Sequence, residues 1–526
     1  MRPSALSPLT VALLPLDDRP CNRQFPILLG PVAGARVLVP PKGLLGRFMR
    51  PGKPDDCAAW LRDAARDTDA AIVGVDMLAY GGIVAGRSAS APLRDALKRV
   101  NALRRLGRTR PNLPILAVSL IRRLGTTVAS PETAQVHADL VRFSELSVQP
   151  RLAAELEAVR RRLPGQALDE YLASRRRNHQ VNRAAIALVA EGVIDYLVLA
   201  QEDALPVGPH IAEQQALRAQ ARALGVAHRV AIHPGADEAG MTLLSRAVCA
   251  RHGWRPRVAP VYSRPGGAET VALFEDRPIW RTVRGHIAAI GGVACREHPH
   301  PTLPLAGGGA GADNADIELL VHTPRGPQTY PGTSPPQAPP VAFVRRVARA
   351  AQAGRAAVAD VAYCNGADPE LAAALLEVGA FADLAAYAGW NTAGNTLGTA
   401  LAHAALRRIG IASATGPERA GRDLSHATFL LHRLADDCRY QSQVRREAQA
   451  LAQRLGASPY RLGRHGAVVE EFVRERLTAL CREDFERAFR GRAIGSGLRL
   501  DGVGRIGVRL PWGRLFEVEL QMGLEA

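Results

Sequence analysis

The stretch Tyr196-Leu197-Val198-Leu199-Ala200 is apolar at every position and runs directly into Gln201-Glu202-Asp203. A strand with one face in water alternates apolar and polar residues, whereas a strand covered by helices on both faces is apolar throughout. This stretch therefore predicts a buried strand of a parallel sheet, with polar side chains at its carboxyl end.

Eight similar runs are spread over the first 410 residues, at 11–16, 71–75, 115–120, 229–232, 258–261, 317–321, 358–362 and 384–388. The segments between them carry helix signals, because Ser130-Pro131-Glu132 and Asp368-Pro369-Glu370 each offer an N-cap followed by proline. This alternation predicts an α/β fold. Nine runs are close to the eight strands of a (β/α)8 barrel, with one left over, and a doubly wound arrangement of two open parallel sheets explains the count as well. We favour the barrel-like arrangement.

The pattern changes near residue 410. We expect residues 1–410 to form an α/β catalytic domain, with a helical insertion at 131–192 and surface loops in the Pro- and Gly-rich segment 299–340. Residues 411–526 predict a smaller helical-plus-β domain. Its helices are expected near 424–434, 441–456 and 466–490, and the alternation at 503–508 and 515–520 is typical of antiparallel strands.

Composition excludes several classes of protein. The 526 residues are 47% hydrophobic and 22% charged, as in a globular chain, and the net charge is +17. The basic residues are almost all dispersed arginines and aromatics are only 5%, so we expect no nucleic-acid partner. The sequence contains no stretch of 18 apolar residues, so we expect no membrane partner. Seven cysteines without a C-x-x-C pair argue against a disulfide framework or a structural zinc site, and favour a cytoplasmic location.

Polar residues gather at the carboxyl ends of the predicted strands. In barrels and in open parallel sheets, ligands bind at that edge. We therefore expect one shared site for a small-molecule or carbohydrate substrate. Its candidate residues are Asp17, Asp18, Arg19, Asp76, Tyr80, Glu202, Asp203, His233, Asp237, Glu238, Asn365, Trp390 and Asn391.

Four of these segments carry a resemblance to a known family. They are Pro15-Leu16-Asp17-Asp18-Arg19-Pro20, Asp76-Met77-Leu78-Ala79-Tyr80-Gly81-Gly82, His233-Pro234-Gly235-Ala236-Asp237-Glu238 and Gly389-Trp390-Asn391-Thr392-Ala393-Gly394-Asn395-Thr396-Leu397-Gly398. Over nearly its whole length the chain resembles a bacterial family known as domain of unknown function 4127. The name implies no activity. The chain departs from the family at Glu202-Asp203, where Asp-Asp is expected.

A second likeness concerns chemistry. Adjacent carboxylates after a middle strand, followed by Trp390-Asn391 after a late one, are similar in arrangement to the substrate-assisted hexosaminidases of the hyaluronidase-like type. Two carboxyl groups in different surroundings can serve as proton donor and as stabiliser of a cationic transition state. We therefore predict a hydrolase of glycosidic bonds, in which Asp203 is the general acid and Glu202 or Asp237 is the stabiliser.

Structural roles compete with each assignment. Asp17 and Arg19 can form an ion pair beside a helix cap near Asn22, and Asp203 or Asp237 can cap the next helix. Trp390 can stack on a sugar or simply pack. A further helix face carries Arg175, Asn178 and Asn182, which suits either a hydroxyl-rich ligand or solvent.

Two other functions stay open. The first is a metal-dependent hydrolase or lyase that uses Asp17, Asp18, Asp76, His233 and Asp237, since imidazole and carboxylate suit zinc or manganese. The second is a non-catalytic carbohydrate-binding protein. We assign no metal-ligating set and no cofactor, and the sequence leaves the oligomeric state open.

Overall fold

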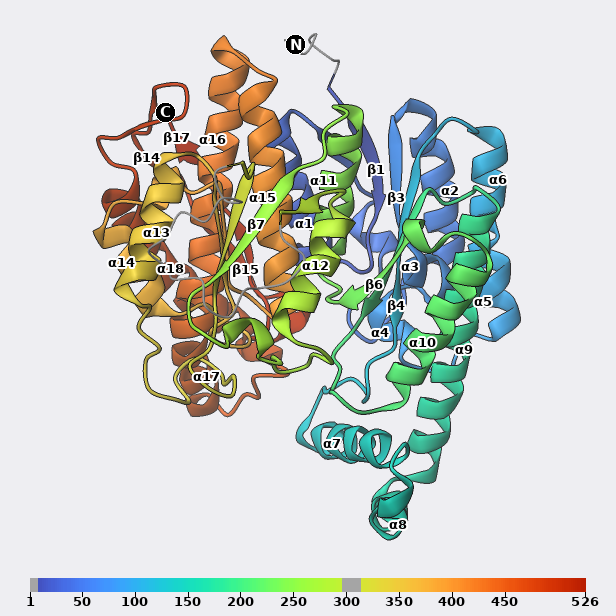
Figure 1. Cartoon of the computed structure of the whole chain (residues 1–526). Helices are drawn as coiled ribbons and strands as arrows, with labels where there is room; N and C mark the ends of the chain where they lie inside the picture. Colours follow the sequence, from blue (N-terminus) through green and yellow to red (C-terminus); the bar gives the residue numbers. More distant parts are fainter. Residues whose placement is uncertain (1–7, 296–313) are drawn as a thin grey trace.

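The computed structural model describes residues 8–295 and 314–526, which form two parallel sheets with helices between and around them (Figure 1). The first sheet has the order β2-β1-β3-β4-β5-β6, and every neighbouring pair is parallel. Its strands are β1 (Thr10–Leu14), β2 (Arg36–Leu38), β3 (Ala70–Gly74), β4 (Ile115–Ile121), β5 (Tyr196–Gln201) and β6 (Val230–Pro234). In the middle of this sheet, Val118 pairs with Gly74 on one side and Val198 on the other.

The second sheet has the order β11-β10-β9-β7-β8 and is also parallel throughout. Its strands are β7 (Arg257–Tyr262), β8 (Val293–Ala294), β9 (Ile317–His322), β10 (Ala356–Asp360) and β11 (Ala386–Ala388). Buried apolar residues fill its central strands, as expected for a sheet with helices on both faces.

A layer of four helices separates the two sheets and packs on both of them (Figure 1). They are α1 (Pro20–Leu29), α11 (Ala239–Arg251), α12 (Ile279–Ala289) and α15 (Ala393–Ala412). Successive strand residues point to opposite faces, so Val11 and Leu13 join the central core while Ala12 and Leu14 join the outer core of the first sheet. The largest core of the protein therefore lies between the sheets.

Other helices cover the outer faces of the two sheets. On the first sheet these are α2 (Pro54–Ala64), α3 (Val75–Tyr80), α5 (Leu93–Val100), α6 (Ala102–Thr109), α9 (Gly165–Ala190) and α10 (Pro209–Ala223), with the short α4 (Ile83–Gly86) beside α3. On the second sheet they are α13 (Val341–Gln352), α14 (Pro369–Glu377), α16 (Gly416–Arg433) and α18 (Gly466–Ala488). Ser130 caps the helix α7 (Pro131–Leu146) and Asp368 caps α14, where the sequence predicts N-caps.

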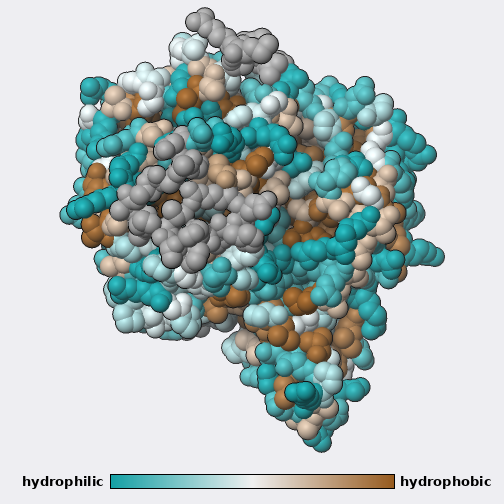
Figure 2. Space-filling model, viewed as in Figure 1, coloured by the Kyte–Doolittle hydropathy of each residue, from teal (hydrophilic) through white to brown (hydrophobic). Residues whose placement is uncertain are grey.

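One helical part projects from the body of the protein (Figure 1). It contains α7 (Pro131–Leu146), α8 (Ala153–Arg162) and the first turns of α9, around a small core of their own. In the view of Figure 2, hydrophobic residues gather on this projection and at its junction with the body, while much of the remaining face is hydrophilic.

The chain ends in mixed structure beside the second sheet. A π-helical segment, Leu434–Val444, joins α16 to α17 (Arg445–Arg454), and three short antiparallel pairs follow α18. These pairs are β12 (Ala493–Ile494) with β13 (Leu498–Arg499), β14 (Gly502–Val503) with β17 (Leu524–Glu525), and β15 (Gly507–Arg509) with β16 (Glu519–Gln521). None of the described helices has both the length and the apolar composition needed to cross a membrane.

The prediction of an α/β fold is confirmed, and each of the nine runs overlaps a strand. The chain adopts two open sheets, so the barrel-like arrangement that we favoured is wrong; neither sheet closes on itself within the described residues. The physical reason is the central helix layer, which covers the sheet faces that a barrel would turn inward. The sequence analysis missed β2 and β8, which have three and two residues. Part of the predicted loop segment 299–340, residues 299–313, lies outside the described residues.

Candidate functional site

A cleft of about 460 Å³ lies where the carboxyl edges of the two sheets meet. Each of the nine predicted strands is followed by a segment that lines it. These lining residues are Arg19, Arg87, Arg123, Asp203, Asp237, Phe274, Tyr330, Asn365 and Asn391, after β1, β3, β4, β5, β6, β7, β9, β10 and β11. The C-terminal part of the chain forms another wall, with Arg445, Tyr460, Trp512 and Arg514. The cleft is therefore at the edge where open parallel sheets bind ligands.

Left-handed backbone conformations are concentrated at this cleft. Six described residues other than glycine have positive φ, and five of them line it: Asp203, Phe274, Asn365, Asn391 and Trp512. The sixth, Phe48, stacks on Trp512 with ring centroids 5.1 Å apart. Such conformations cost about 1–3 kcal/mol each and often cluster at functional sites. Their concentration singles out the cleft from the rest of the surface.

Arg19 is the centre of a buried charge network on one wall. Its guanidinium pairs with Asp17 at 2.7 Å, with Asp237 at 2.6 Å and with Glu517 at 3.4 Å. Asn22 also donates to Asp17, at 2.8 Å. The local Asp17–Arg19 ion pair therefore exists, and it is extended by two carboxylates that are far away in the sequence.

The beginning of α15 holds the 235–237 loop of the first sheet in place. Asn395 Oδ1 accepts hydrogen bonds from the backbone N–H groups of Ala236 and Asp237, both at 3.0 Å. The Asn391 amide donates to Asp237 Oδ2 at 2.9 Å. Asn391 O in turn accepts from the backbone of Asn365 at 3.0 Å. The two asparagines thus connect the edges of the two sheets, as their spacing of four residues permits.

Glu202 and Asp203 lie on the opposite wall, each beside an arginine. Strand β5 ends at Gln201 and Asp203 has φ 22°, so the alternation of a regular strand stops and all three polar residues reach the cleft. Arg87 donates to Glu202, and Arg123 pairs with Asp203 at 2.5 Å. Burial alone would raise the pKa of Glu202, but Arg87 and Arg123 outweigh it and lower that pKa.

Two predicted groups lie beside the cleft without lining it. Asp18 accepts a hydrogen bond from Trp512 Nε1 at 2.8 Å, and burial together with the neighbouring Asp17 raises its pKa to about 6. Trp390 is buried and packs edge-on against Phe25 at 6.5 Å between ring centroids. Trp390 therefore has a packing role.

Asp76 and Tyr80 are buried under the first sheet's edge. Asp76 Oδ2 accepts from the backbone of Leu120 at 2.9 Å, and burial raises the pKa of Asp76 to about 7. Tyr80 lies under the guanidinium of Arg177, 4.2 Å from the ring centroid. These contacts fix the ends of β3 and β4 and point no group into the cleft.

The helix face of Arg175, Asn178 and Asn182 is also buried. Both asparagine amides donate to Leu120 O at 2.9 Å, while Arg175 pairs with Glu213 at 2.7 Å. The face is therefore shielded from solvent, and its asparagines satisfy the backbone at the carboxyl end of β4.

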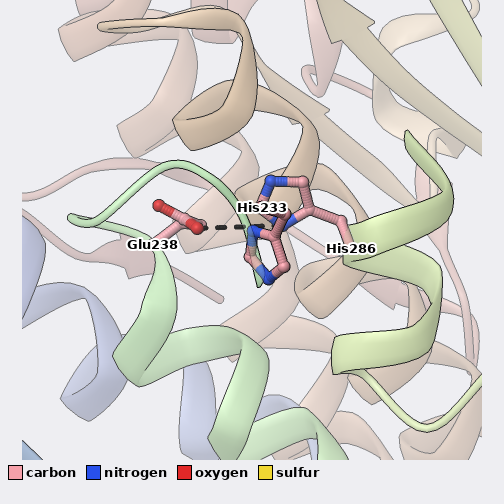
Figure 3. A group of neighbouring side chains, drawn as sticks. All are labelled: His233, Glu238 and His286. Atoms are coloured by element: carbon pink, nitrogen blue, oxygen red, sulfur yellow. Dashed lines mark ion pairs between the residues drawn. The ribbon is translucent and has the colours of Figure 1, made fainter. Parts of the chain in front are cut away.

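His233 and Glu238 lie behind the cleft wall, together with His286 of α12 (Figure 3). Glu238 follows Asp237 directly, but its carboxylate points toward His286, at 3.7 Å between Oε1 and Nδ1. The carboxylates proposed as metal ligands do not gather here, because Arg19 holds Asp17 and Asp237.

The sequence analysis missed most of the arginines and aromatics of the cleft. Arg87 follows two short helices instead of a strand, and Tyr330 and Trp512 lie in loops without a distinctive motif. Arg122-Arg123 at the end of its strand was the one available signal for Arg123. His286 is in the middle of an amphipathic helix, where no spacing rule connects it to His233.

The fold and the cleft define an α/β protein with a polar cleft between two open parallel sheets. Residues 11–521 match the model of the family described as "Protein of unknown function (DUF4127)", and the chain belongs to that family. No curated protein and no solved structure matches the chain.

Proposed function

We propose that this protein hydrolyses a glycosidic bond of a carbohydrate bound in the cleft between the two sheets. The observation that carries the proposal is the set of three carboxylates, Glu202, Asp203 and Asp237, on facing walls of a cleft that also presents aromatic rings. A volume of about 460 Å³ suits a small sugar ligand. Aromatic faces and side-chain amides are suited to the apolar and hydroxyl parts of a sugar ring.

Asp203 is the group proposed to exchange the proton with the glycosidic oxygen. Its side chain is 28% exposed, against 10% for Glu202 and 7% for Asp237, so it is the most accessible of the three carboxylates. Its strained backbone places it at the end of β5, in the cleft. Because Arg123 pairs with it at 2.5 Å, substrate must separate the two groups before Asp203 can act as an acid.

Glu202 and Asp237 are proposed to stabilise positive charge on the sugar. Both are held in place by arginine, Glu202 by Arg87 and Asp237 by Arg19. A fixed anion next to the developing oxocarbenium ion lowers the barrier without having to reorganise. The two carboxylates supply the charge and Asp203 supplies the proton.

A screen of aryl glycosides tests the proposal, with Asp203→Asn as the main variant. General acid catalysis typically contributes about 10²–10⁴-fold, so we expect a loss of that order in kcat/KM. Glu213→Gln is a matched control, because Glu213 is an arginine-paired carboxylate that does not line the cleft. If no glycoside is turned over faster than by the Glu202→Gln/Asp203→Asn double variant, the proposal is wrong.

The second candidate is non-catalytic carbohydrate binding. It is favoured by the ion pairs themselves, since Glu202, Asp203 and Asp237 each have an arginine partner. A screen of sugars by thermal shift, followed by recovery of the bound sugar, separates the two candidates. A ligand recovered chemically unchanged favours binding, and a cleaved one favours hydrolysis.

A further inference from the structure

Behind the cleft wall, three fully buried side chains from different elements turn toward one another (Figure 3). His233 is the penultimate residue of strand β6, Glu238 directly precedes α11, and His286 lies on α12. One nitrogen of each histidine and one oxygen of Glu238 lie within 4.8 Å of one another. We call these residues the histidine–glutamate cluster.

Hydrogen bonds to a single carbonyl determine which nitrogen of each histidine is protonated. Pro234 O lies 2.9 Å from His233 Nδ1 and 3.1 Å from His286 Nε2. A carbonyl oxygen only accepts, so both of these nitrogens carry hydrogen. In a neutral imidazole the other nitrogen then has a free lone pair. These lone pairs are on His233 Nε2 and His286 Nδ1.

The same two nitrogens, together with Glu238 Oε1, have no hydrogen-bond partner among the described residues. The other carboxylate oxygen of Glu238 is satisfied by the backbone N–H of Ala236 at 2.8 Å. Burial of an unsatisfied polar group costs about 1–3 kcal/mol, and native proteins rarely keep several of them together. Three unsatisfied acceptors at one point are better explained by a shared ligand.

Glycines leave room beside these acceptors. A Cβ at Gly398 of α15 would overlap Glu238 Cγ and come within 2.9 Å of His286 Nδ1. A Cβ at Gly235 would overlap the Glu238 carboxylate. Gly398 has an ordinary helical backbone, so position 398 requires glycine because of limited space and not because of its backbone conformation. The absence of side chains here keeps the three acceptor atoms clear.

We propose that His233 Nε2, His286 Nδ1 and Glu238 Oε1 bind a divalent transition-metal ion, with zinc as the expected metal. Two neutral imidazoles and one carboxylate form a common zinc ligand set. Metal-ligating histidines usually donate their other N–H to a carboxylate or a backbone carbonyl, as both do here to Pro234 O. A cation also supplies the positive charge that no lysine or arginine of the described residues brings to Glu238.

The ion has a structural role that is separate from the proposed hydrolysis. His286 and Glu238 side chains are 0% exposed, whereas a catalytic metal needs a coordination position that substrate can reach. The three ligands come from β6, the loop after it and α12, so the ion joins these elements. Since Asp237 immediately precedes Glu238, the ion holds the loop that carries Asp237 into the cleft.

The metal content of the full-length protein tests the inference directly. The protein is dialysed against excess Zn²⁺, separated from free metal and analysed by elemental mass spectrometry. We expect one zinc per wild-type chain and a loss of that zinc in His286→Gln and in the isosteric Glu238→Gln. His432→Gln, which changes a buried histidine outside the cluster, should keep it. Wild-type protein without bound metal, or full occupancy in Glu238→Gln, would overturn the inference.

Two measurements keep the test valid if a variant folds poorly. Replacement of zinc by Co²⁺ in the wild-type protein should give the visible absorption of cobalt bound to nitrogen and oxygen ligands, and a chelator should lower its Tm. Unchanged Tm and no cobalt spectrum would contradict the proposal. Neither readout depends on glycoside cleavage, so a metal-binding protein without glycosidase activity would disprove only the proposed function.

Discussion

The cleft and the histidine–glutamate cluster meet in one loop, yet their buried carboxylates are balanced in opposite ways. Asp237 is held by Arg19, and Glu202 across the cleft is held by Arg87. Glu238, the next residue after Asp237, has no lysine or arginine partner among the described residues. Neighbouring residues of one motif therefore differ in the origin of their counter-charge: Arg19 of the chain supplies that of Asp237, whereas the proposed metal ion supplies that of Glu238.

Removal of Arg19 should leave Asp237 without a counter-charge from the chain, and we expect this change to have the largest effect on stability. In Arg19→Met, the carboxylates of Asp17 and Asp237 stay buried without their cation, whereas Glu517 keeps its ion pair with Arg514. Breaking a buried ion pair on one side typically costs about 3–5 kcal/mol. We expect a fall of that size in the free energy of unfolding, measured by urea denaturation.

Lys42→Met provides the control for that experiment. Lys42 pairs with Glu519 at 2.7 Å, but its side chain is 46% exposed, and exposed ion pairs contribute less than about 1 kcal/mol. If Arg19→Met is no less stable than Lys42→Met, the Arg19 network does not stabilise the fold.

Asp76 is a third kind of buried carboxylate, because it has no ion pair among the described residues. Its pKa is about 7 in the folded protein, against 3.8 for an unperturbed carboxyl. Below pH 3.8 both folded and unfolded chains keep the proton. Between these values the unfolded chain releases it first, so wild-type stability falls as pH rises and the penalty is complete above pH 7.

Asp76→Asn removes this titration while it keeps an oxygen for Leu120 N. We expect the free energy of unfolding of the variant, relative to that of the wild type, to rise by about 2–3 kcal/mol from pH 5 to pH 8. Urea denaturation of both proteins at the two pH values measures this difference. The difference between the two proteins isolates Asp76 from Glu275, whose pKa burial also raises to about 7. A stability difference that does not change with pH would contradict the explanation.

The smallest predicted effect concerns the strained backbone of the cleft. Asn391 has φ 68°, a conformation that glycine adopts freely and alanine does not. Both Asn391→Gly and Asn391→Ala lose the hydrogen bond to Asp237, so their difference reports on the backbone alone. We expect the alanine variant to be less stable by about 1 kcal/mol in thermal unfolding. Equal stability of the two would show that this conformation is not strained.

The strands and the edge where polar residues gather could be predicted from sequence, because both follow from local patterns. The run 196–200 is apolar because β5 is covered on both faces, and Gln201, Glu202 and Asp203 follow it because β5 ends there. Parallel strands bring such ends to a common edge, so Asp203, Asp237 and Asn391 line one cleft. The same reasoning could not choose between barrel and open sheets, since strand number alone does not fix closure.

Partners of these side chains could not be predicted, since they are set by three-dimensional packing. Asp17, Asp18 and Arg19 form one motif, yet Arg19 binds Asp237 and Asp18 binds Trp512. His233 has its partner His286 on a helix more than fifty residues later. Asp76 had the same kind of strand-end position as Asp203, but packing under Leu120 buried it.

Trp512 and Glu517 reach back to Asp18 and Arg19, almost five hundred residues earlier in the chain. During synthesis on the ribosome, both sheets can therefore emerge and pair long before the wall that these two residues build. The nascent chain carries an incomplete cleft until translation has passed Glu517, so the cleft takes its full form only after the strands of both sheets have been made.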